Sequence, residues 1–484
     1  LQKRRIVWTY RHRRPAHLIV LCFVLLIAVT ILTPLSAAGE VDEDLSRRIE
    51  TFLAGVYSDD EPGAAVIAVR EGAVVYRGAI GMADLELGVP LEPEMVFRLG
   101  SITKQFTAAA ILLLEEEGKL EVTDPITEYL PDYPTNGHTI TIEHLLTHTS
   151  GIYSYTDLPG YMATTVRQDM TVEELIEQFK DQPMEFSPGE RWSYSNSGYI
   201  LLGAILEEVS GVTYAEFLED RIFEPLDLQQ TYYGGPQIIP NRVTGYDNNA
   251  NGLRNAYPLS MTQPYAAGSI LSTVDDLAQW NAALFGGDLL SSASLEKMTS
   301  PYTLNDGSSA SYGYGLAATQ LRGSAALTHG GGIFGFQTLG IHIPDHDVYV
   351  AVLSNSSGHR PDTGYVGLKV AAMLMGTPFE DFKATQLDPS LLERLTGTYQ
   401  INEGNVRVVT VDDGRLFTQR TGGDRLEAVP HSKTGFFYRD TLTHFEIVLN
   451  EEGNPTRMLM YHDGSDEPES AEYLDPVPSD DDSE

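Results

Sequence analysis

Apolar residues follow two periodicities in the first half of this chain of 484 residues. Residues 62–81 (PGAAVIAVREGAVVYRGAIG) hold two apolar runs around Glu71-Gly72, which predicts two strands joined by a tight turn. Apolar residues recur three and four positions apart in residues 97–118 (FRLGSITKQFTAAAILLLEEEG) and in four segments within residues 141–227, most of them with Pro or Gly at an edge. We therefore expect a sheet that begins near residue 62, followed by a helical insertion.

The strand pattern returns after the helical segments. Residues 326–343 (ALTHGGGIFGFQTLGIHI) and 346–356 (HDVYVAVLSNS) read as strands, and a helical run follows at residues 365–375. The pattern predicts an α/β (α+β) domain at residues 40–375, built as sheet, helical insertion, sheet and closing helix.

A second, smaller domain follows a linker. Residues 376–390 contain two prolines and little periodicity, as linkers do. Residues 391–476 consist of short alternating runs between turn residues, which predicts a small all-β barrel or sandwich. The last residues, 477–484, are an acidic tail.

Residues 1–39 have a different composition. Six basic residues precede an uncharged run over residues 18–32, and Ser36-Ala37-Ala38 precedes acidic sequence. This is the layout of a signal peptide; the alternative is an uncleaved anchor, because the run extended to Ala38 is nearly long enough to span a membrane. Both interpretations predict export to the periplasm or the medium, with membrane contact only through an uncleaved segment.

Charge and cysteine content exclude several functions. The formal net charge is -36, and without the six basic residues of residues 1–39, which hold no acidic residue, it is -42. Such a surface repels nucleic acid and anionic membranes; it fits a secreted protein in salty surroundings or simple solubility. The single cysteine, Cys22, lies in the first segment, so the exported part has neither disulfide nor thiol chemistry.

Three short motifs that suggest acyl transfer, S-x-x-K, Y-x-N and H-x-G, each occur twice. The first copies are Ser101–Lys104, Tyr194–Asn196 and His329–Gly331, and the second copies are Ser294–Lys297, Tyr246–Asn248 and His462–Gly464. Only the first copies have a suitable setting, because Ser101 opens an apolar helix, Tyr194 precedes another, and His329 begins a glycine-rich strand. In that order they can converge between the sheet and the helical insertion. Ser294 instead starts a polar surface helix, where a capping role explains it.

The first S-x-x-K has the spacing of a nucleophile and its base. At positions i and i+3, Ser101 and Lys104 share a helix face, so the amine can reach the hydroxyl. Desolvation lowers the pKa of a lysine placed against an apolar helix, which lets its amine act as a base. Tyr194 is a second candidate proton carrier, because a neighbouring ammonium draws a phenol toward phenolate.

Other residues of the motifs suit substrate binding. The expected substrate-binding residues are Asn196, His329, Gly330 and Gly331. Asn196 offers an amide to a substrate carbonyl and to Lys104. The glycines allow close backbone approach along a strand edge, so that the N–H groups of Ser101 and Gly332 can form an oxyanion hole. The set predicts acyl transfer through a serine ester.

These residues resemble the serine β-lactamase and penicillin-binding-protein family, and most closely its branch of class C β-lactamases and D-Ala-D-Ala carboxypeptidases. The resemblance covers about residues 61–375, and its longest signatures are FRLGSITKQFTAAAILLLEEEGKL, TIEHLLTHTSGI, YSNSGYILLGAILEEVSG and HGGGIFGF. It implies an antiparallel sheet flanked by helices, an all-helical subdomain, and the nucleophile Ser101 at their junction. It implies Lys104 and Tyr194 as general base and acid, although which of them takes the serine proton stays open. It also implies that residues 391–476 form a lipocalin-like β domain.

One departure narrows the substrate. Class C β-lactamases carry K-T-G where this chain has His329-Gly330-Gly331, and a histidine with a pKa of about 6.5 is mostly neutral at pH 7. We therefore expect an exported serine hydrolase of the D-Ala-D-Ala carboxypeptidase or β-lactamase-related type. Its substrate would be a small molecule or peptide, such as a peptidoglycan stem peptide, a β-lactam or an ester. The alternatives are a carboxylesterase or D-aminopeptidase of the same fold, and a penicillin-binding sensor without turnover.

Other chemistries find little support. His144 and His148 have zinc-like spacing in HLLTH, but no glutamate follows His144, which breaks the H-E-x-x-H pattern. The G-x-S-x-G elbow of α/β-hydrolases is missing. No metal and no other cofactor is therefore expected. Trp192 and Phe334 are candidates for lining the cleft or for simple packing.

Overall fold

A computed structural model describes residues 43–249 and 251–475. The predicted signal or anchor segment (1–39) and acidic tail (477–484) lie outside the described residues. Within the part that is described, no helix combines the length and the apolar character needed to cross a bilayer.

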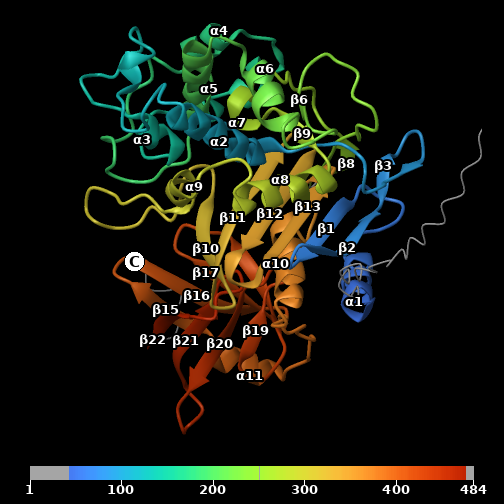
Figure 1. Cartoon of the computed structure of the whole chain (residues 1–484). Helices are drawn as coiled ribbons and strands as arrows, with labels where there is room; N and C mark the ends of the chain where they lie inside the picture. The colour runs from blue at the N-terminus through green and yellow to red at the C-terminus, as the bar shows by residue number, and fades with distance from the viewer. Residues whose placement is uncertain (1–42, 250, 476–484) are drawn as a thin grey trace, which may run out of the picture. The chain divides into compact units, whose positions relative to one another are not determined.

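A six-stranded antiparallel sheet carries the first domain (Figure 1). In spatial order its strands are β10 (Ala317–Leu321), β11 (Ser324–Ile333), β12 (Phe336–Ile343), β13 (Val348–Ser354), β1 (Ala64–Arg70) and β2 (Ala73–Ile80). The predicted hairpin is confirmed: Glu71 and Gly72 connect β1 to β2 with φ of 53° and 70°, the left-handed pair that matches the twist of the strands. Because β13 pairs with β1 from Ala64↔Ser354 to Arg70↔Val348, the strands on either side of the insertion form one sheet.

Strand β1 is buried on both faces. Its residues Ala65 and Ile67 belong to the core shared with the helical insertion, whereas Val66 and Ala68 face a second core. Side chains from α1 (Glu43–Ala54) and α10 (Thr363–Leu374) fill that second core, and α8 (Val274–Gly286) packs on β13 and β1. Side chains alternate along a strand, so a strand covered on both faces needs the continuous apolar run seen in the sequence.

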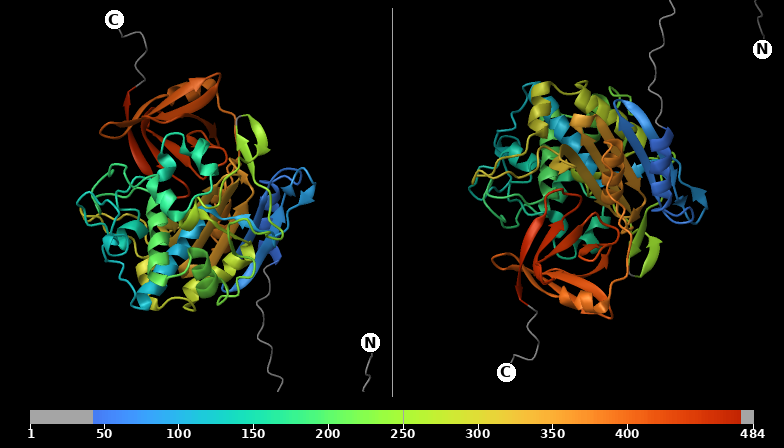
Figure 2. Two further views of the ribbon diagram at one scale, coloured as in Figure 1. Left: turned by 90° about the horizontal axis from the view of Figure 1, so that it is seen from above. Right: turned by 90° about the horizontal axis from the view of Figure 1, so that it is seen from below.

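The remaining helices gather over one face of the sheet (Figure 2). They are α2 (Thr103–Glu116), α3 (Ile142–Leu146), α4 (Val172–Glu177), α5 (Asn196–Ser210), α6 (Tyr214–Leu218), α7 (Tyr265–Gly268) and α9 (Ser292–Thr299), with a π-helical turn η6 (Glu219–Phe223) and the 3-10 turns η1 (Gly100–Ile102), η2 (Ile126–Glu128), η3 (Tyr155–Asp157), η4 (Tyr161–Ala163) and η5 (Thr165–Arg167). A further 3-10 turn, η7 (Pro344–His346), connects β12 to β13. Thr141, Thr171 and Thr213 begin α3, α4 and α6 with capping boxes, which explains why such short helices have defined starts.

Short strands tie the insertion to the sheet. They are β3 (Met82–Asp84) with β4 (Val89–Pro90), β5 (Phe97–Arg98) with β9 (Ile270–Ser272) and β6 (Tyr232–Tyr233), and β7 (Tyr246–Asn249) with β8 (Gly252–Asn255) and β14 (Ser356–Ser357). The pairing of β5 with β9 fixes the chain immediately before η1 and α2.

Residues 375–388 contain neither helix nor strand, and α11 (Pro389–Arg394) then leads into a closed eight-stranded barrel. Its strands are β15 (Gly397–Asn402), β16 (Asn405–Asp412), β17 (Arg415–Arg420), β18 (Arg425–Pro430), β19 (Gly435–Phe437), β20 (His444–Leu449), β21 (Pro455–Tyr461) and β22 (Glu469–Asp475). Of the two predicted architectures, barrel and sandwich, the barrel is confirmed. Large buried side chains form its core, among them Tyr399, Phe436, Phe445 and Met458, so its interior is packed.

Candidate active site

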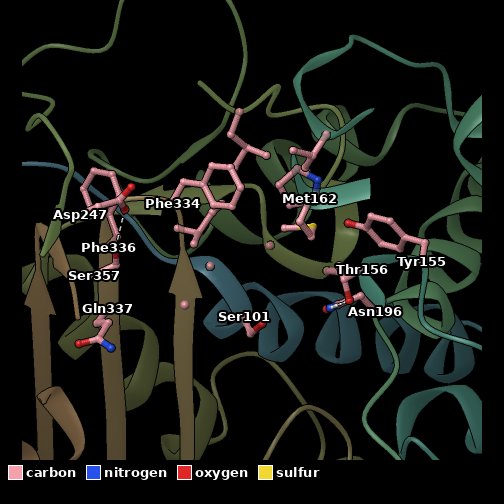
Figure 3. Close-up of a pocket in the computed structure, with 18 residues that line it drawn as sticks. Ser101, Tyr155, Thr156, Met162, Asn196, Asp247, Phe334, Phe336, Gln337 and Ser357 are labelled. Carbon is pink, nitrogen blue, oxygen red and sulfur yellow. Dashed lines mark hydrogen bonds between the residues drawn. The ribbon is translucent and has the colours of Figure 1, made fainter. Parts of the chain in front are cut away.

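Ser101 lies in the 3-10 turn η1, where the sheet meets the helical insertion. The preceding residue, Gly100, has φ of 57° and packs against strand β11, so closely that a Cβ there would lie 3.1 Å from the Gly332 nitrogen. Ser101 borders a cavity of about 320 Å³ (Figure 3). The predicted position of the serine, at the junction of sheet and helices, is therefore observed.

Lys104 is completely buried one turn further along α2, and three groups surround its amine. Its Nζ lies 3.0 Å from Ser101 Oγ, 2.9 Å from Asn196 Oδ1 and 2.8 Å from the Ala267 carbonyl oxygen. Burial lowers the pKa of Lys104 well below its usual value. The amide and carbonyl oxygens can only accept, so they take two amine protons and leave the third tetrahedral position to the serine. In the neutral amine that position holds the lone pair, as a base for Ser101 requires.

Asn196 begins α5 and is held at both ends of its amide. Its Oδ1 accepts from Lys104, and its Nδ2 donates to Thr156 Oγ1 at 3.2 Å. Its backbone N–H donates to Ser154 Oγ at 3.2 Å. Thr156 also borders the cavity, so this network forms one wall beside Ser101 (Figure 3).

Tyr194 lies close to these groups, with its ring centre 4.8 Å from Lys104 Nζ. Its hydroxyl is buried and makes no well-formed hydrogen bond in the resting structure, although the Ser101 hydroxyl lies close enough to affect its pKa. Burial raises the pKa of the Tyr194 phenol, and the neighbouring Ser101 hydroxyl offsets only part of the rise. The expected drift toward phenolate is therefore reversed, because desolvation outweighs the attraction of an amine that is itself driven toward neutrality. The Tyr194 phenol is therefore protonated at neutral pH.

Strand β11 carries the glycines predicted to contact substrate. Strand β10 pairs with it only as far as Thr328, so among the described strands nothing pairs with that edge of β11 from His329 onward. A Cβ on Gly331 would lie 1.9 Å from the Leu99 carbonyl oxygen, whereas one on Gly332 would meet open space. Gly331 thus lets β11 approach the serine turn, and Gly332 borders the cavity together with Ser101, as expected of an oxyanion hole.

The His329 side chain lies elsewhere than predicted. Its ring is buried and does not border the cavity: Nε2 accepts from the Tyr312 hydroxyl at 2.7 Å, and Nδ1 donates to the Gly330 carbonyl oxygen at 2.6 Å. Burial, with a smaller contribution from Lys104, lowers the pKa of His329 to about 3. The imidazole is therefore neutral and occupied by the protein, so it holds no substrate carboxylate.

The cavity walls are mainly apolar. Their large apolar side chains are Met162, Val166, Leu259, Ile333, Phe334 and Phe336. Among the described residues that border the cavity, Asp247 is the only aspartate, glutamate, lysine, arginine or histidine; its Oδ1 accepts from Ser357 Oγ at 2.7 Å and its Oδ2 lies 3.5 Å from an Arg254 nitrogen. Phe334 is thus a wall residue, whereas Trp192 packs near His148 outside the cavity.

Comparison with known proteins shows which family the chain belongs to. Residues 45–372, more than half of the chain, match the family model described as Beta-lactamase. The chain belongs to the beta-lactamase family. Residues 382–474 match a domain of unknown function (DUF3471).

Several similar proteins carry the names of penicillin-binding proteins or hydrolases. Penicillin-binding protein 4* of Bacillus subtilis (strain 168) is 30% identical, over 87% of this chain and 97% of the relative. A D-aminopeptidase of Gluconobacter oxydans (strain 621H) is 27% identical, over 74% of this chain and 68% of the relative. The solved octameric penicillin-binding protein homologue from Pyrococcus abyssi is 28% identical with a TM-score of 0.62, over 87% of this chain and 96% of that one. The predicted family and fold class are therefore confirmed.

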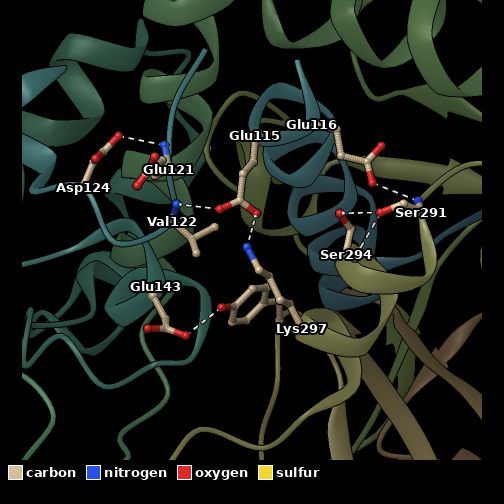
Figure 4. Close-up of polar contacts among 10 residues, drawn as sticks. Glu115, Glu116, Glu121, Val122, Asp124, Glu143, Ser291, Ser294 and Lys297 are labelled. Atoms are coloured by element: carbon tan, nitrogen blue, oxygen red, sulfur yellow. Dashed lines mark hydrogen bonds and ion pairs between the residues drawn. The ribbon is translucent and has the colours of Figure 1, made fainter. Parts of the chain in front are cut away.

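The second S-x-x-K motif of this beta-lactamase-family chain, Ser294–Lys297, does not repeat the arrangement of Ser101 and Lys104 (Figure 4). Lys297 pairs with Glu115 at 2.9 Å and remains largely in solvent. The helix α9 is capped by Ser291, whose Oγ accepts from the backbone N–H of Ser294. The prediction that Ser294 caps the helix was therefore wrong, because the cap is Ser291, three residues earlier. The motif still has a structural role at the start of a helix.

Sequence reasoning missed several residues of the site. They are Ser154, Tyr155, Thr156, Asp247, Ala267, Gln337 and Ser357. Most lie on a loop, on a 3-10 turn or on strands of only a few residues, where neither periodicity nor a motif gives a signal. Ala267 acts through its backbone carbonyl, which any residue supplies, so its role has no signature in the sequence.

Proposed function

We propose that this protein is an exported serine hydrolase that forms an acyl-enzyme on Ser101 and cleaves amides or esters. The observation that carries the proposal is the arrangement around the buried Lys104, which leaves one free position of its amine facing Ser101 Oγ. Export rests on the composition of residues 1–39.

The reaction needs only groups of the site. Ser101 Oγ bonds to the substrate carbonyl carbon while its proton passes to Lys104, and the N–H groups of Ser101 and Gly332 hold the oxyanion. Tyr194 gives a proton to the leaving group as the scissile bond breaks, and recovers one from Lys104. Water then releases the acyl group by the same proton transfers, which restores both residues.

Among the candidate substrates, we favour amides and esters that need no carboxylate anchor. No described cationic side chain borders the cavity, His329 is neutral, and the one charge is the carboxylate of Asp247. This supports the D-aminopeptidase or esterase alternative over a D-Ala-D-Ala carboxypeptidase, whose substrate ends in a carboxylate. The similarity to a protein named D-aminopeptidase points the same way.

Turnover and intact-mass measurements on four probes test the proposal. They are D-alanine p-nitroanilide, p-nitrophenyl butyrate, a peptide ending in D-Ala-D-Ala, and a fluorescent penicillin. We expect cleavage of the anilide and the ester by wild type and by the control Ser294→Ala, and none by Ser101→Ala. An active Ser101→Ala variant would refute the nucleophile. A peptide cleaved faster than the anilide would restore the carboxypeptidase interpretation, and a penicillin adduct without release of any product would favour the sensor.

The variant Asp247→Asn tests the charge of the cavity. Removing a partly shielded carboxylate is worth about 1 kcal/mol, so kcat/KM for the ammonium-bearing anilide should fall about 3- to 10-fold. The uncharged ester should change less, and the carboxylate-bearing peptide should improve. Equal changes for all three would show that Asp247 acts on packing and not on substrate charge.

A further inference from the structure

The HLLTH segment contributes two histidines that the reaction does not use. His144 completes the capping box of its own helix, because its Nδ1 accepts from the backbone N–H of Thr141 at 3.1 Å. His148 is different: it is 1% exposed and lies beside the segment that carries Tyr194 and Asn196. Despite their zinc-like spacing, the two histidines therefore have separate structural roles.

His148 holds that segment at two points. Its carbonyl oxygen accepts from the Ser193 N–H at 3.0 Å, and its Nδ1 accepts from the Ser195 N–H at 3.1 Å. The residue has φ of 58°, a left-handed conformation that few residues other than glycine, asparagine, aspartate and histidine adopt. With this backbone, both the main chain and the ring of one residue bond to the two residues that flank Tyr194.

The ring of His148 also supports the ring of Tyr194. The two centres are 4.2 Å apart at an interplanar angle of 37°. The rings of Tyr199 and Tyr312 lie 5.1 Å and 4.9 Å from the imidazole and restrict it from other directions. Burial lowers the pKa of His148 well below its usual value, which keeps Nδ1 free to accept.

The Tyr194 hydroxyl itself makes no well-formed hydrogen bond, so the phenol is held through its ring and its main chain. We propose that His148 is a positioning residue that sets the Tyr194 phenol and the start of α5 at Asn196 relative to Ser101. The inference rests on the proposed function for its catalytic consequence. Tyr194 must protonate the leaving group of an amide, whereas p-nitrophenolate leaves without a proton.

The ratio of amide to ester turnover therefore reports the position of Tyr194. In His148→Leu, which removes the acceptor, we expect kcat/KM for the p-nitroanilide to fall at least about 10-fold more than that for the p-nitrophenyl ester. His148→Asn should recover part of the ratio, because its Oδ1 replaces Nδ1 as an acceptor and asparagine tolerates a left-handed φ. General destabilisation would lower both activities together, and thermal unfolding of each variant measures it separately.

His144→Leu is the matched control, since it removes a half-buried histidine acceptor that does not contact the Tyr194 segment; its ratio should equal that of wild type. An unchanged ratio in His148→Leu, or an Asn variant no better than the Leu variant, would overturn the proposal. Crystal structures give a readout that does not depend on turnover. If the Tyr194 ring and the Ser195 nitrogen stay in place in the structure of His148→Leu, the positioning role of His148 is also overturned. If wild type shows no turnover that depends on Ser101, only the proposed function is refuted.

Discussion

Replacing Tyr194 by phenylalanine should make the protein more stable and less active. The substitution removes one hydroxyl and keeps the ring that packs on His148. That hydroxyl is buried and makes no well-formed hydrogen bond in the resting structure, where its polar neighbour is the Ser101 hydroxyl, so little compensates for its lost hydration. A group kept in such a state suits an acid whose partner, the leaving group, arrives only with the substrate.

The magnitude follows from the energy of an unpaired buried hydroxyl. Such a group costs about 1–3 kcal/mol, so Tyr194→Phe should raise the free energy of unfolding by about 1 kcal/mol. Tyr199→Phe is the control: this tyrosine also packs on His148 and is fully buried, but its hydroxyl donates to the Leu146 carbonyl oxygen at 2.8 Å. Losing that bond should lower the free energy of unfolding by about 1 kcal/mol.

Urea or thermal denaturation of the two variants, read against wild type, gives the sign of each change. Amide turnover by Tyr194→Phe should fall about 100-fold or more, the usual contribution of a general acid. If Tyr194→Phe were destabilised as much as Tyr199→Phe, the hydroxyl would have a ground-state partner, and the argument for a poised acid would be refuted.

Three further outcomes are expected. For an ester substrate, kcat/KM should fall as pH drops through the lowered pKa of Lys104, because the ammonium has no lone pair. If this fall at low pH disappears in Tyr194→Phe, the base is Tyr194 instead of Lys104. Gly331→Ala should fail to fold, since its Cβ would lie 1.9 Å from a carbonyl oxygen, while Gly332→Ala should fold and lose turnover. Similar circular dichroism spectra and melting points for the two variants would contradict the packing of β11. Burial lowers the pKa of His342 from 6.5 to about 4, so the unfolded chain binds more protons in that window and stability is lost as pH falls through it. The loss of folding free energy attributable to His342 is up to about 3 kcal/mol, and His342→Gln should remove it. If the urea midpoint shifts equally between pH 7 and pH 4.5 in the variant and in wild type, His342 does not cause the loss.

Features set by local backbone geometry were predictable from the sequence. The i, i+3 spacing of Ser101 and Lys104 places both on one helix face in any helix, and the amine is indeed 3.0 Å from the hydroxyl. The turn at Glu71-Gly72 and the apolar runs of β1 and β13 likewise depend on neighbours in the chain, which is why the hairpin and the buried sheet were expected. Alternation predicted short strands in the second domain but left barrel and sandwich undecided, and the structure shows a closed eight-stranded barrel.

Features set by contacts between distant segments needed the tertiary structure. The Ala267 carbonyl that directs the Lys104 amine, and the Asp247 carboxylate in the cavity, lie on segments far from Ser101 in the sequence. The sequence placed His329 on the right strand, yet only packing against Tyr312 turned its ring away from the cavity. The sequence by itself indicated which groups are candidates for the chemistry, because spacing along a helix or strand is local. Burial decided their protonation, since desolvation depends on everything that surrounds a group in the folded protein.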